Sequence, residues 1–422
     1  MRILYSVVLY LLAPLVVLRL LWRGLSQRGY WRRWPERFGF GPALGAPKLI
    51  WVHAVSVGEV RAAQPLVRRL LETHPDHAVL ITTMTPTGSE QVLSLFGDSV
   101  MHCYVPYDLP TAVARFLKRA RPRLALVMET ELWPNIFHLC RARSIPVIVA
   151  NVRMSEQSMR RYLRFKSLTA ATLQQVSLLA VQSEADAARL RALGAPEEII
   201  RVTGSIKFEI NLPASLREVG EVLRNTWGRG RSIWIAASTH EGEDAQILAA
   251  YDDVKARIPS LLLVLVPRHP ERCAAVARLC RRAGHSVTLH SERLTVDDRT
   301  DIVLGDTMGE LQVFFTAGDV AFIGGSLVRH GGHNPLEASA VGVPVVFGPH
   351  MFNFAEISQL TLESGAGTEV RDVGELARAV IDYLERPDLR ARAGEAGRRM
   401  VAQNRGALDN TLALVNRFLP DS

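Results

Sequence analysis

The sequence has few cysteines, and none of them forms a pattern typical of a disulfide framework or a metal site. Its 422 residues include four cysteines, and no two are spaced as CxxC: Cys103, Cys140, Cys273 and Cys280. Disulfide-stabilised secreted domains are dense in cysteine, whereas scattered cysteines are typical of a reducing compartment. We therefore expect free thiols and no structural disulfide.

The sequence also lacks the nucleotide-binding fingerprints of two large enzyme classes. It contains no Walker loop and no G-x-G-x-x-G run, which counts against a P-loop nucleotidase and an NAD-dependent enzyme. It has no internal repeat, no low-complexity tract and no nucleic-acid-binding module. The net charge of +8 and the pI near 9.6 therefore favour a nucleotide or a phospholipid surface as the acidic partner.

Length and composition indicate a globular protein of two domains. Hydrophobic residues make up 48% of the chain and charged residues 22%, a balance that excludes a disordered protein. A chain of 422 residues is too long for one hydrophobic core and suits two domains of about 200 residues each.

The N-terminus carries an apolar run that predicts membrane attachment. Residues 3–22 are almost wholly apolar, close to the ~20 residues that span a bilayer, although Pro14 and Arg19 leave an interfacial helix open. No small-residue cleavage site follows. Arginines and aromatic residues crowd residues 23–37 instead, which suits an anchor at anionic headgroups. The alternative is a buried helix with a solvated basic face.

After this run, short apolar segments alternate with helical patterns, which predicts parallel sheets covered on both faces. We expect strands at 49–53, 78–83, 124–128, 147–150 and 178–181, and then at 233–237, 261–266, 302–304, 320–323 and 343–347. Closing helices are expected near 373–384, 389–402 and 407–418. We place an anchor at 1–24, an N-terminal domain at 25–210, a linker at 211–230, a C-terminal domain at 231–405 and a closing helix at 406–422.

A glycine-rich loop between an apolar strand and a helix is the strongest candidate for a ligand site. Four glycines fall between residues 324 and 332, and a helical pattern begins near Asn334. Such a loop admits a phosphate toward the helix N-terminus, and Glu337 lies where a carboxylate reaches a sugar hydroxyl. A tight turn is the alternative. His330 and His333 lack acidic or cysteine partners at fixed spacing, so we expect no metal.

Four further motifs follow predicted strands. HAVSVGE (53–59) places Glu59 at a helix start, where dipole complementation alone would explain it. METELWPN (128–135) places Glu129 and Glu131 beside Trp133, which indicates a pocket wall. STHEGED (238–244) fits helix capping and hydrogen bonding to a ligand oxygen equally well. VPRHPER (266–272) is a stiff cationic loop that suits a phosphate or carboxylate.

Eight motifs in order, over almost the whole chain, resemble those of the 3-deoxy-D-manno-octulosonic acid (Kdo) transferases of lipopolysaccharide assembly. They are HAVSVGE, METELWPN, NVRMS, GSIKFE, STHEGE, PRHPER, GDTMGEL and GGHNPLE. The resemblance implies a GT-B glycosyltransferase whose two Rossmann-like domains face a cleft. It implies inverting transfer, without metal or cofactor, from CMP-Kdo to a tetraacyl lipid A disaccharide precursor. It also implies attachment to the cytoplasmic face of the inner membrane.

The resemblance further assigns roles to individual residues. Glu59 matches the acceptor-side catalytic acid, which we expect to act as a general base that the helix N-terminus keeps ionised, with Glu131 in support. Ser56 and Gly58 would contact the acceptor. The donor-binding residues would be Lys207, Arg268, His269, Met308, Gly309, Glu310, Asn334 and Glu337.

Two other functional classes share parts of this pattern. A nucleotide-sugar epimerase has the same two-domain architecture but no need for the apolar run at residues 3–22. A non-catalytic lipid-binding protein would explain that run and the arginines after it, but not the glycine-rich loop after residue 323.

Overall fold

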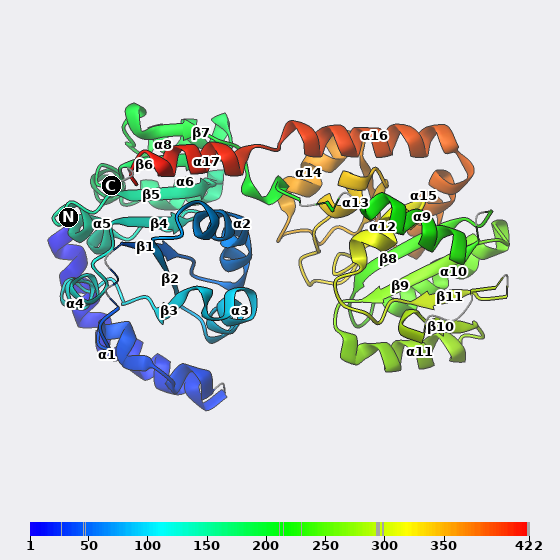
Figure 1. Cartoon of the computed structure of the whole chain (residues 1–422), viewed down its shortest axis with the longest axis horizontal. Helices are drawn as coiled ribbons and strands as arrows, with labels where there is room; N and C mark the ends of the chain where they lie inside the picture. Colours follow the sequence, from blue (N-terminus) through cyan, green and yellow to red (C-terminus); the bar gives the residue numbers. More distant parts are fainter. Residues whose placement is uncertain are drawn as a thin grey trace. The chain divides into compact units, whose positions relative to one another are not determined.

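The structure is a computed structural model that describes residues 1–26, 28–44, 46, 48–210, 212–213, 215–228, 230–292, 296–297 and 299–419. The chain forms two compact units (Figure 1): unit 1 is Met1–Glu209 with Arg405–Ser422, and unit 2 is Ile210–Asn404. Each unit has a seven-stranded sheet in which the paired strands are parallel. The predicted α/β class is therefore confirmed.

The sheet of unit 1 has the strand order β3-β2-β1-β4-β5-β6-β7. Its strands are β1 (Leu49–His53), β2 (Ala78–Thr83), β3 (Met101–Tyr104), β4 (Leu124–Met128), β5 (Val147–Val152), β6 (Leu178–Val181) and β7 (Ile200–Val202). The bounds predicted for β1, β2, β4 and β6 are confirmed. Strands β1, β4 and β5 are buried at every residue because helices cover both faces of the sheet.

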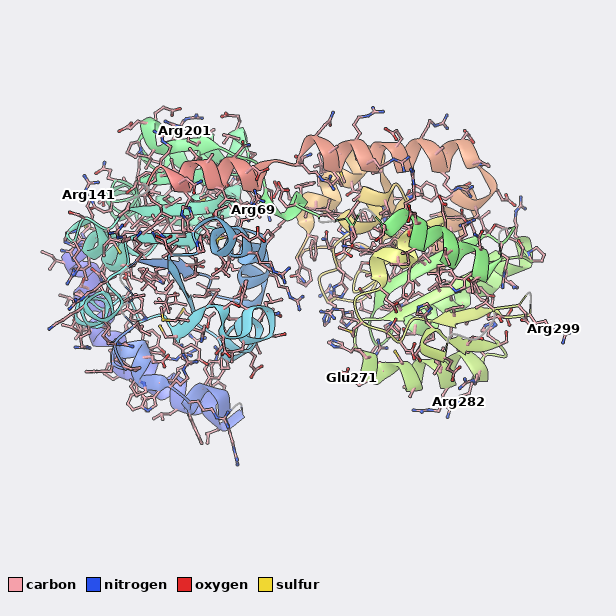
Figure 2. The ribbon with its side chains drawn as sticks, viewed as in Figure 1. Arg69, Arg141, Arg201, Glu271, Arg282 and Arg299 are labelled. Atoms are coloured by element: carbon pink, nitrogen blue, oxygen red, sulfur yellow. The ribbon has the colours of Figure 1, made fainter. Side chains whose placement is uncertain are left out.

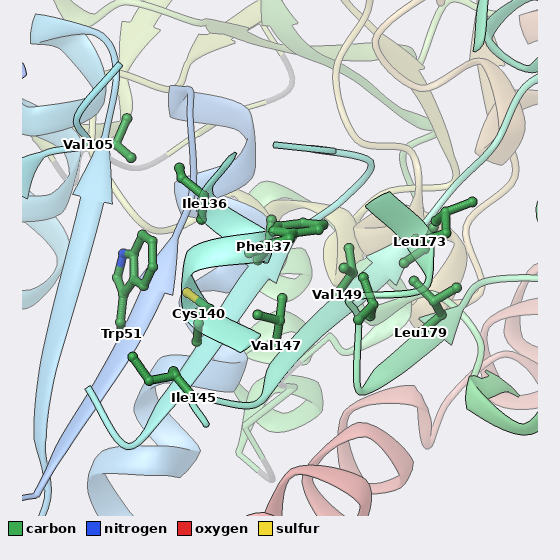
Figure 3. Packing of buried hydrophobic residues seen from close by; sticks show 14 of the residues in the cluster. Trp51, Val105, Ile136, Phe137, Cys140, Ile145, Val147, Val149, Leu173 and Leu179 are labelled. Carbon is green, nitrogen blue, oxygen red and sulfur yellow. The ribbon is translucent and has the colours of Figure 1, made fainter. Parts of the chain in front are cut away.

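Two apolar clusters flank this sheet. One contains Trp51, Phe116 and Phe137 (Figure 3) and joins the sheet to α4 (Pro110–Ala120), α5 (Pro134–Arg141), α7 (Lys166–Leu173) and α8 (Glu184–Ala192). The other joins it to α2 (Val57–Thr73), α3 (Pro86–Phe96) and α17 (Ala407–Asn416). Helix α6 (Glu156–Leu163) lies between β5 and α7 in the chain. The last helix thus belongs to unit 1, although it follows unit 2 in the sequence.

The sheet of unit 2 has the order β10-β11-β9-β8-β12-β13-β14. Its strands are β8 (Ile233–Thr239), β9 (Leu262–Pro267), β10 (Val287–Leu289), β11 (Ile302–Leu304), β12 (Val320–Ile323), β13 (Val345–Phe347) and β14 (Gly367–Glu369). Its helices are α9 (Leu216–Trp227), α10 (Asp244–Arg257), α11 (Cys273–Arg282), α12 (Leu311–Ala317), α13 (Leu336–Val341), α14 (Ala355–Glu363), α15 (Val373–Glu385) and α16 (Pro387–Gln403). Apolar clusters again cover both faces.

The segment predicted as a linker, 211–230, contains helix α9. This helix packs on α12 so closely that a Cβ at Gly220 would lie 1.9 Å from Thr316 Oγ1. Trp227, 1% exposed, joins the core of unit 2. Gly228 ends the helix as its C-cap, at φ +102°. Asn211, the first residue of the predicted linker, lies outside the described residues.

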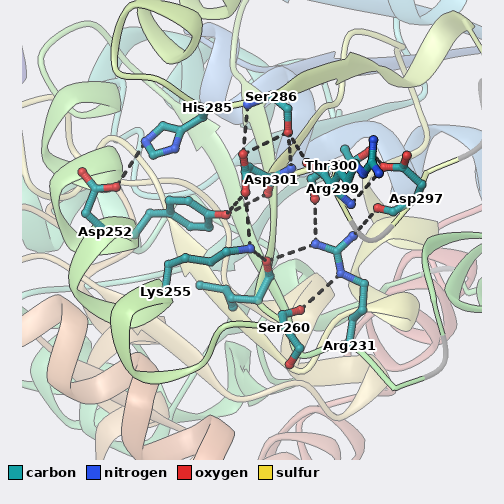
Figure 4. A network of polar contacts seen from close by, with 12 residues as sticks. Arg231, Asp252, Lys255, Ser260, His285, Ser286, Asp297, Arg299, Thr300 and Asp301 are labelled. Atoms are coloured by element: carbon teal, nitrogen blue, oxygen red, sulfur yellow. Dashed lines mark hydrogen bonds and ion pairs between the residues drawn. The ribbon is translucent and has the colours of Figure 1, made fainter.

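A buried arginine ties the strand starts of unit 2 together, away from the carboxyl edge. The guanidinium of Arg231 donates to the carbonyls of Ser260, Leu261, Asp297 and Thr300 at 2.7–3.2 Å (Figure 4). By contrast, Figure 2 shows other charged side chains, including Arg69 and Arg282, at the periphery of the two units. Because the four carbonyls come from two connections, the one before β9 and the one before β11, Arg231 fixes how those two connections pack.

Helix α1 (Arg2–Ser26) precedes the first sheet and lies against unit 1 (Figure 1). By length and composition, Arg2–Leu25 qualifies as a helix that could cross a membrane. Two short 3-10 turns, Arg28–Trp31 and Trp34–Phe38, follow it. The predicted N-terminal apolar helix is therefore present.

Candidate active site

Each sheet has one switch point, which is a pair of neighbouring strands whose following connections lead to opposite halves of the sheet. In unit 1 this point lies between β1 and β4, and in unit 2 between β8 and β12. Ligands of doubly wound α/β sheets bind at such points, outside the carboxyl ends of the strands. Four predicted motifs follow these strands: HAVSVGE, METELWPN, STHEGED and the glycine-rich loop.

Glu59 lies in the first turn of α2, directly beyond β1. Ser56 is the N-cap of this helix, and its hydroxyl both accepts from the Glu59 N–H and donates to Glu59 Oε1 at 3.1 Å. The other carboxylate oxygen, Oε2, accepts from the Val55 N–H at 2.7 Å. This arrangement is close to a capping box, in which serine and glutamate satisfy each other across one turn. The Glu59 carboxyl is thereby held in one orientation.

Burial raises the pKa of Glu59 to about 7, and the nearby carboxylates of Glu131 and Glu129 contribute to the rise. The hydrogen bonds from Val55 and Ser56 oppose this shift and do not outweigh it. Burial thus opposes the effect expected of the helix N-terminus, which is to keep Glu59 ionised, because the residue is only 9% exposed. A carboxylate with a pKa near 7 still suits proton transfer at neutral pH, since a general base works best when its pKa is close to the working pH.

Glu131 occupies the other side of the switch point, between β4 and α5. Its Oε2 accepts from Trp133 Nε1 at 2.9 Å, and burial raises its pKa, with the charge of Glu129 adding to the effect. Trp133 packs edge-on against the ring of His53, with the ring centroids 5.6 Å apart. His53 is buried and its pKa is lowered to about 4, so this ring is neutral at neutral pH. Glu131 is thus fixed by an aromatic wall.

Two residues with positive φ lie at the carboxyl ends of β4 and β5, on the same edge of the sheet as Glu131. Glu129 has φ +58°, and its carboxylate lies 3.4 Å from Lys207 Nζ. Asn151, at the end of β5, also has φ +58°, and its Oδ1 accepts from the Ile206 N–H at 3.1 Å. Non-glycine residues adopt this conformation rarely, and they do so most often where function requires it. Asn151 therefore positions the turn that carries Lys207.

Asn151 received no role from the sequence, although the residue lies in the motif NVRMS. The structure shows it fully buried, with no hydrogen-bond partner for Nδ2 among the described residues. An asparagine at the end of an apolar strand is the one available sequence signal, because asparagine tolerates positive φ better than most residues. That signal is weak without the structure.

In unit 2 the glutamate beyond β8 has a different role. Glu243 is 0% exposed, and its carboxylate accepts from four backbone N–H groups, those of His240, Gly325, Ser326 and Leu327, at 2.6–3.0 Å. Three of these donors belong to the glycine-rich loop after β12. Both oxygens of Glu243 are therefore committed to holding this loop, and this side chain makes no cap hydrogen bond to α10.

Four histidine rings gather next to this loop. The ring of His240 stacks on that of His330, with the centroids 3.6 Å apart, and its Nε2 lies 2.7 Å from His333 Nε2. His269 approaches His240 edge-on at 5.8 Å. Burial lowers the pKa of His240 to about 4, with His330 and the neighbouring cationic side chains adding to the effect. Among the described residues, no group of three or more His, Cys, Asp or Glu side chains is arranged to hold a metal ion.

The cationic loop after β9 is tied to the same place. The Arg268 N–H donates to the Thr239 carbonyl at 3.0 Å, and Arg272 donates to that carbonyl at 2.8 Å and to Asp244. The Arg268 side chain is half-buried and, within the described residues, has no ion pair. The backbone of the loop is therefore fixed, while the Arg268 guanidinium is available to a ligand.

Asn334 and Glu337 follow the glycine-rich loop. The Oδ1 of Asn334 accepts from the Leu336 N–H at 3.1 Å, so this side chain caps the short helix α13. Burial raises the pKa of Glu337, and the described residues offer its carboxyl no hydrogen bond. A half-buried carboxyl without a protein partner is suited to accept from a ligand hydroxyl.

The remaining predicted donor residues lie farther along the same edge or in the other unit. Met308 is 73% exposed, Gly309 has φ +84°, and Glu310 lies 3.4 Å from His290. This turn follows β11, two strands from β8, and among the described residues no hydrogen bond or ion pair joins it to the histidine cluster. Lys207 lies in unit 1. Within the units, the structure therefore groups Ser56, Gly58, Glu59, Glu131 and Lys207, and separately Arg268, His269, Asn334 and Glu337.

Similarity to known proteins covers the chain from end to end. Residues 32–210 match the family 3-Deoxy-D-manno-octulosonic-acid transferase (kdotransferase), and residues 245–400 match glycosyl transferases group 1. A 3-deoxy-D-manno-octulosonic acid transferase of Haemophilus influenzae is 42% identical over 421 residues, 99% of both chains. One of Bordetella pertussis is 36% identical over 430 residues, 98% of this chain and 99% of that one.

A solved structure with the same overall fold comes from another enzyme class. The UDP-GlcNAc 2-epimerase of Neisseria meningitidis, bound to UDP-GlcNAc, aligns with a TM-score of 0.55. The alignment covers 88% of this chain and 99% of the epimerase, at 14% identity. At such low identity the likeness shows the fold alone. The GT-B expectation is consistent with this neighbour and with the glycosyl transferase match.

Proposed function

The chain belongs to the 3-deoxy-D-manno-octulosonic acid transferases, and on that basis we propose that it transfers Kdo from CMP-Kdo to a hydroxyl of a tetraacyl lipid A disaccharide precursor. Family membership supports Kdo transfer itself, through 42% identity over 99% of the chain. The acceptor, the donor and the course of the reaction are proposals. The observation that supports them best is the pair of acids at the switch point of unit 1, the buried Glu59 and the half-buried Glu131.

In the proposed reaction, a lipid hydroxyl attacks the anomeric carbon of Kdo while Glu59 accepts the hydroxyl proton. A new C–O bond forms on the face opposite CMP. The bond from the anomeric carbon to the CMP phosphate oxygen breaks, and its electron pair leaves with CMP, so the configuration inverts. Gly58 is exposed, and a Cβ there would meet only Ser56 Oγ, at 3.8 Å, which leaves room for a bulky acceptor beside Glu59. We assign acceptor binding to Ser56 and Gly58.

We assign the donor to unit 2. The guanidinium of Arg268 and the nearby His269 suit the CMP phosphate and the Kdo carboxylate, and Glu337 suits the ribose hydroxyls. Asn334 and the turn of Met308, Gly309 and Glu310 complete the proposed set. Cationic side chains and backbone N–H groups of the glycine-rich loop would offset the charge that develops on CMP without a metal ion.

Lys207 remains a proposed donor residue on weaker grounds. It lies in unit 1, where its Nζ is 3.4 Å from Glu129. An ammonium in this position would attract the Kdo carboxylate and also lower the repulsion between the acids of unit 1. Either effect would bring negative charge closer to Glu59.

We also propose that α1 attaches the protein to the cytoplasmic face of the inner membrane. The support is the apolar surface of α1 and the arginines that follow it. Deletion of residues 1–22 should release the protein from membranes. It should also lower activity on dispersed lipid acceptor, while activity on a detergent-soluble acceptor survives.

An assay of CMP release from CMP-Kdo, with and without the lipid A precursor and with mass analysis of the lipid, tests the proposal. Transfer requires release that depends on the lipid, together with a lipid heavier by Kdo. A product formed without acceptor would instead indicate an epimerase, and lipid binding without any product would indicate a binding protein. Either result would contradict the proposed donor and acceptor.

A further inference from the structure

Helix α1 has two opposite faces with different surroundings. The face made by Arg2, Ser6, Leu9, Ala13 and Leu20 is buried or half-buried. The opposite face repeats at helical spacing and is exposed and wholly apolar: Leu4, Val8, Leu11, Leu15, Leu18, Trp22 and Leu25 are 43–74% exposed. A helix with one apolar face toward the surroundings and the other on protein has the pattern of an interfacial helix.

The covered face is held to unit 1 by polar contacts at the N-terminal end of α1, which we call the latch. Arg2 and Ser6 both donate to Asn135 Oδ1, at 3.1 and 3.0 Å. Tyr5 hydrogen bonds to the carboxyl of Asp108. Asp108 in turn accepts from the backbone N–H groups of Asn135 and Ile136 at the start of α5. The first turns of α1 are therefore fastened to a buried polar cluster of unit 1.

Contact with unit 1 continues along the helix. Tyr10 shares a 2.9 Å hydrogen bond with Thr111 at the start of α4. Leu9, Ala13 and Val16 line a small cavity of about 130 Å³ whose other wall includes Phe38, Tyr107 and Trp133. At the far end Trp31 donates to the Leu21 carbonyl at 3.0 Å. The first half of α1 is thus packed on α4 and α5 of unit 1, whereas its far end contacts the short turn Arg28–Trp31 that directly follows it.

This packing is incompatible with a span. A helix of 25 residues is about 37 Å long, little more than the ~30 Å hydrocarbon core, so a span would use nearly all of it. The parts of unit 1 that contact the first half of α1 would then enter the hydrocarbon as well, including the buried Asp108 cluster and the start of α4 at Thr111. Charged and irregular backbone segments are excluded from that region unless protein covers them.

Charge at one end of the exposed face indicates which surface it meets. Arg19, Arg23, Arg28 and Arg32 are exposed, and Glu36 is the only acidic residue among the first 44. Among the described residues, none of these four arginines pairs with a carboxylate. Trp22 and Trp34, 69% and 48% exposed, lie among them. Exposed arginine and tryptophan beside an apolar stripe match the headgroup layer of an anionic bilayer.

From these contacts we infer that α1 lies in the plane of an anionic bilayer surface, with its Leu4–Leu25 stripe in the lipid and both of its ends on the same side as unit 1. The inference rests on the proposed membrane attachment and decides its geometry. It also gives a reason for the latch: a helix whose first turns are held to unit 1 orients that unit, and with it Glu59, at a fixed height above the lipid.

A topology experiment distinguishes this geometry from a span. The full chain carries a protease-cleavable tag before Met1 and a second tag after Ser422, which belongs to unit 1. It is placed in sealed membrane vesicles that expose unit 1. We expect protease to remove both tags. Protection of the N-terminal tag until the vesicles are opened would mean that α1 crosses the bilayer and would overturn the inference.

A depth probe separates failure of the geometry from failure of the attachment itself. An environment-sensitive dye at Leu11→Cys should shift to an apolar signal on addition of phosphatidylethanolamine–phosphatidylglycerol vesicles. The same dye at Val222→Cys, an exposed position of α9, should not shift. The four native cysteines are buried and should not be labelled in the folded protein. An unchanged signal at Leu11 would overturn both the attachment and the in-plane geometry. A signal that is already apolar without vesicles would do the same, because it would mean that another protein copy covers the stripe.

The latch has its own test in hydrogen exchange on the protein without vesicles. Arg2→Ala with Ser6→Ala removes both hydrogen bonds to Asn135 without changing the sheet or the other helices of unit 1. Amides of residues 2–10 should then exchange faster. A matched pair on the exposed face, Ile3→Ala with Val7→Ala, should leave their exchange unchanged. Equal exchange in both variants would show that the latch does not hold the helix.

Discussion

Each unit places a buried glutamate beyond the strand at its switch point, and the two glutamates have different surroundings. Glu59 follows β1 and accepts from one backbone N–H group and one hydroxyl, whereas Glu243 follows β8 and accepts from four backbone N–H groups. Two donors leave Glu59 with unused lone pairs beside the exposed Gly58. Four donors leave Glu243 with none. The same position in the fold thus holds a carboxyl with free lone pairs in one unit and a carboxyl committed to loop structure in the other.

The most severe test of this contrast is Glu59→Gln. The amide keeps the shape of the side chain but cannot take a proton, so kcat for Kdo transfer should fall by about 10²–10⁴-fold. Binding of CMP and of the lipid acceptor should stay close to normal. Glu131→Gln, the matched control, should lose less. If Glu131→Gln abolishes activity while Glu59→Gln keeps the rate of the native enzyme, the two acids have exchanged roles.

Glu243→Gln should instead affect folding. Its amide nitrogen would face two of the four N–H groups and leave them without an acceptor in a fully buried place. At about 1–3 kcal/mol for each buried group, the free energy of unfolding of unit 2 should fall by about 3 kcal/mol. Chemical denaturation measures this loss. A variant of normal stability that has lost only kcat would place Glu243 in the chemistry and remove the contrast.

The raised pKa of Glu59 predicts a pH dependence specific to unit 1. Only the ionised form accepts a proton, so kcat should decline as pH falls through about 7, by about tenfold per unit well below it. The folded state binds the proton more tightly than the unfolded state. The contribution of Glu59 to stability should therefore fall as pH rises from 4.5 toward about 7. A kcat profile that is flat between about pH 5 and pH 8 would contradict the assignment.

The smallest expected effects concern donor binding in unit 2. Glu337→Ala should weaken CMP binding by about 1–3 kcal/mol, the usual contribution of a hydrogen bond to a charged group. Arg268→Lys should also weaken it, since an ammonium cannot replace the planar guanidinium fork. Calorimetry with CMP measures both. Unchanged affinity in the two folded variants would show that the donor does not bind at this edge of unit 2.

Much of the fold could be predicted from the sequence, and the strands that were missed share one feature. Strands β3, β7, β10 and β14 were not predicted, and these are the two edge strands of each sheet. The predicted strands are longer or almost wholly apolar because helices cover both of their faces. An edge strand such as β14, with the sequence GTE, is short and partly exposed. It therefore has no hydrophobic pattern to read.

Local runs of residue types were enough to specify the α/β class, the apolar N-terminal helix and the motifs of the site. Contacts between segments that are distant in the sequence decided where the helices pack and which role each motif residue has. They placed α17 in unit 1, packed the predicted linker as α9, and surrounded Glu243 with N–H groups from a loop more than 80 residues away. They also raised the pKa of Glu59, since burial and neighbouring charges depend on parts of the chain that are far apart in the sequence.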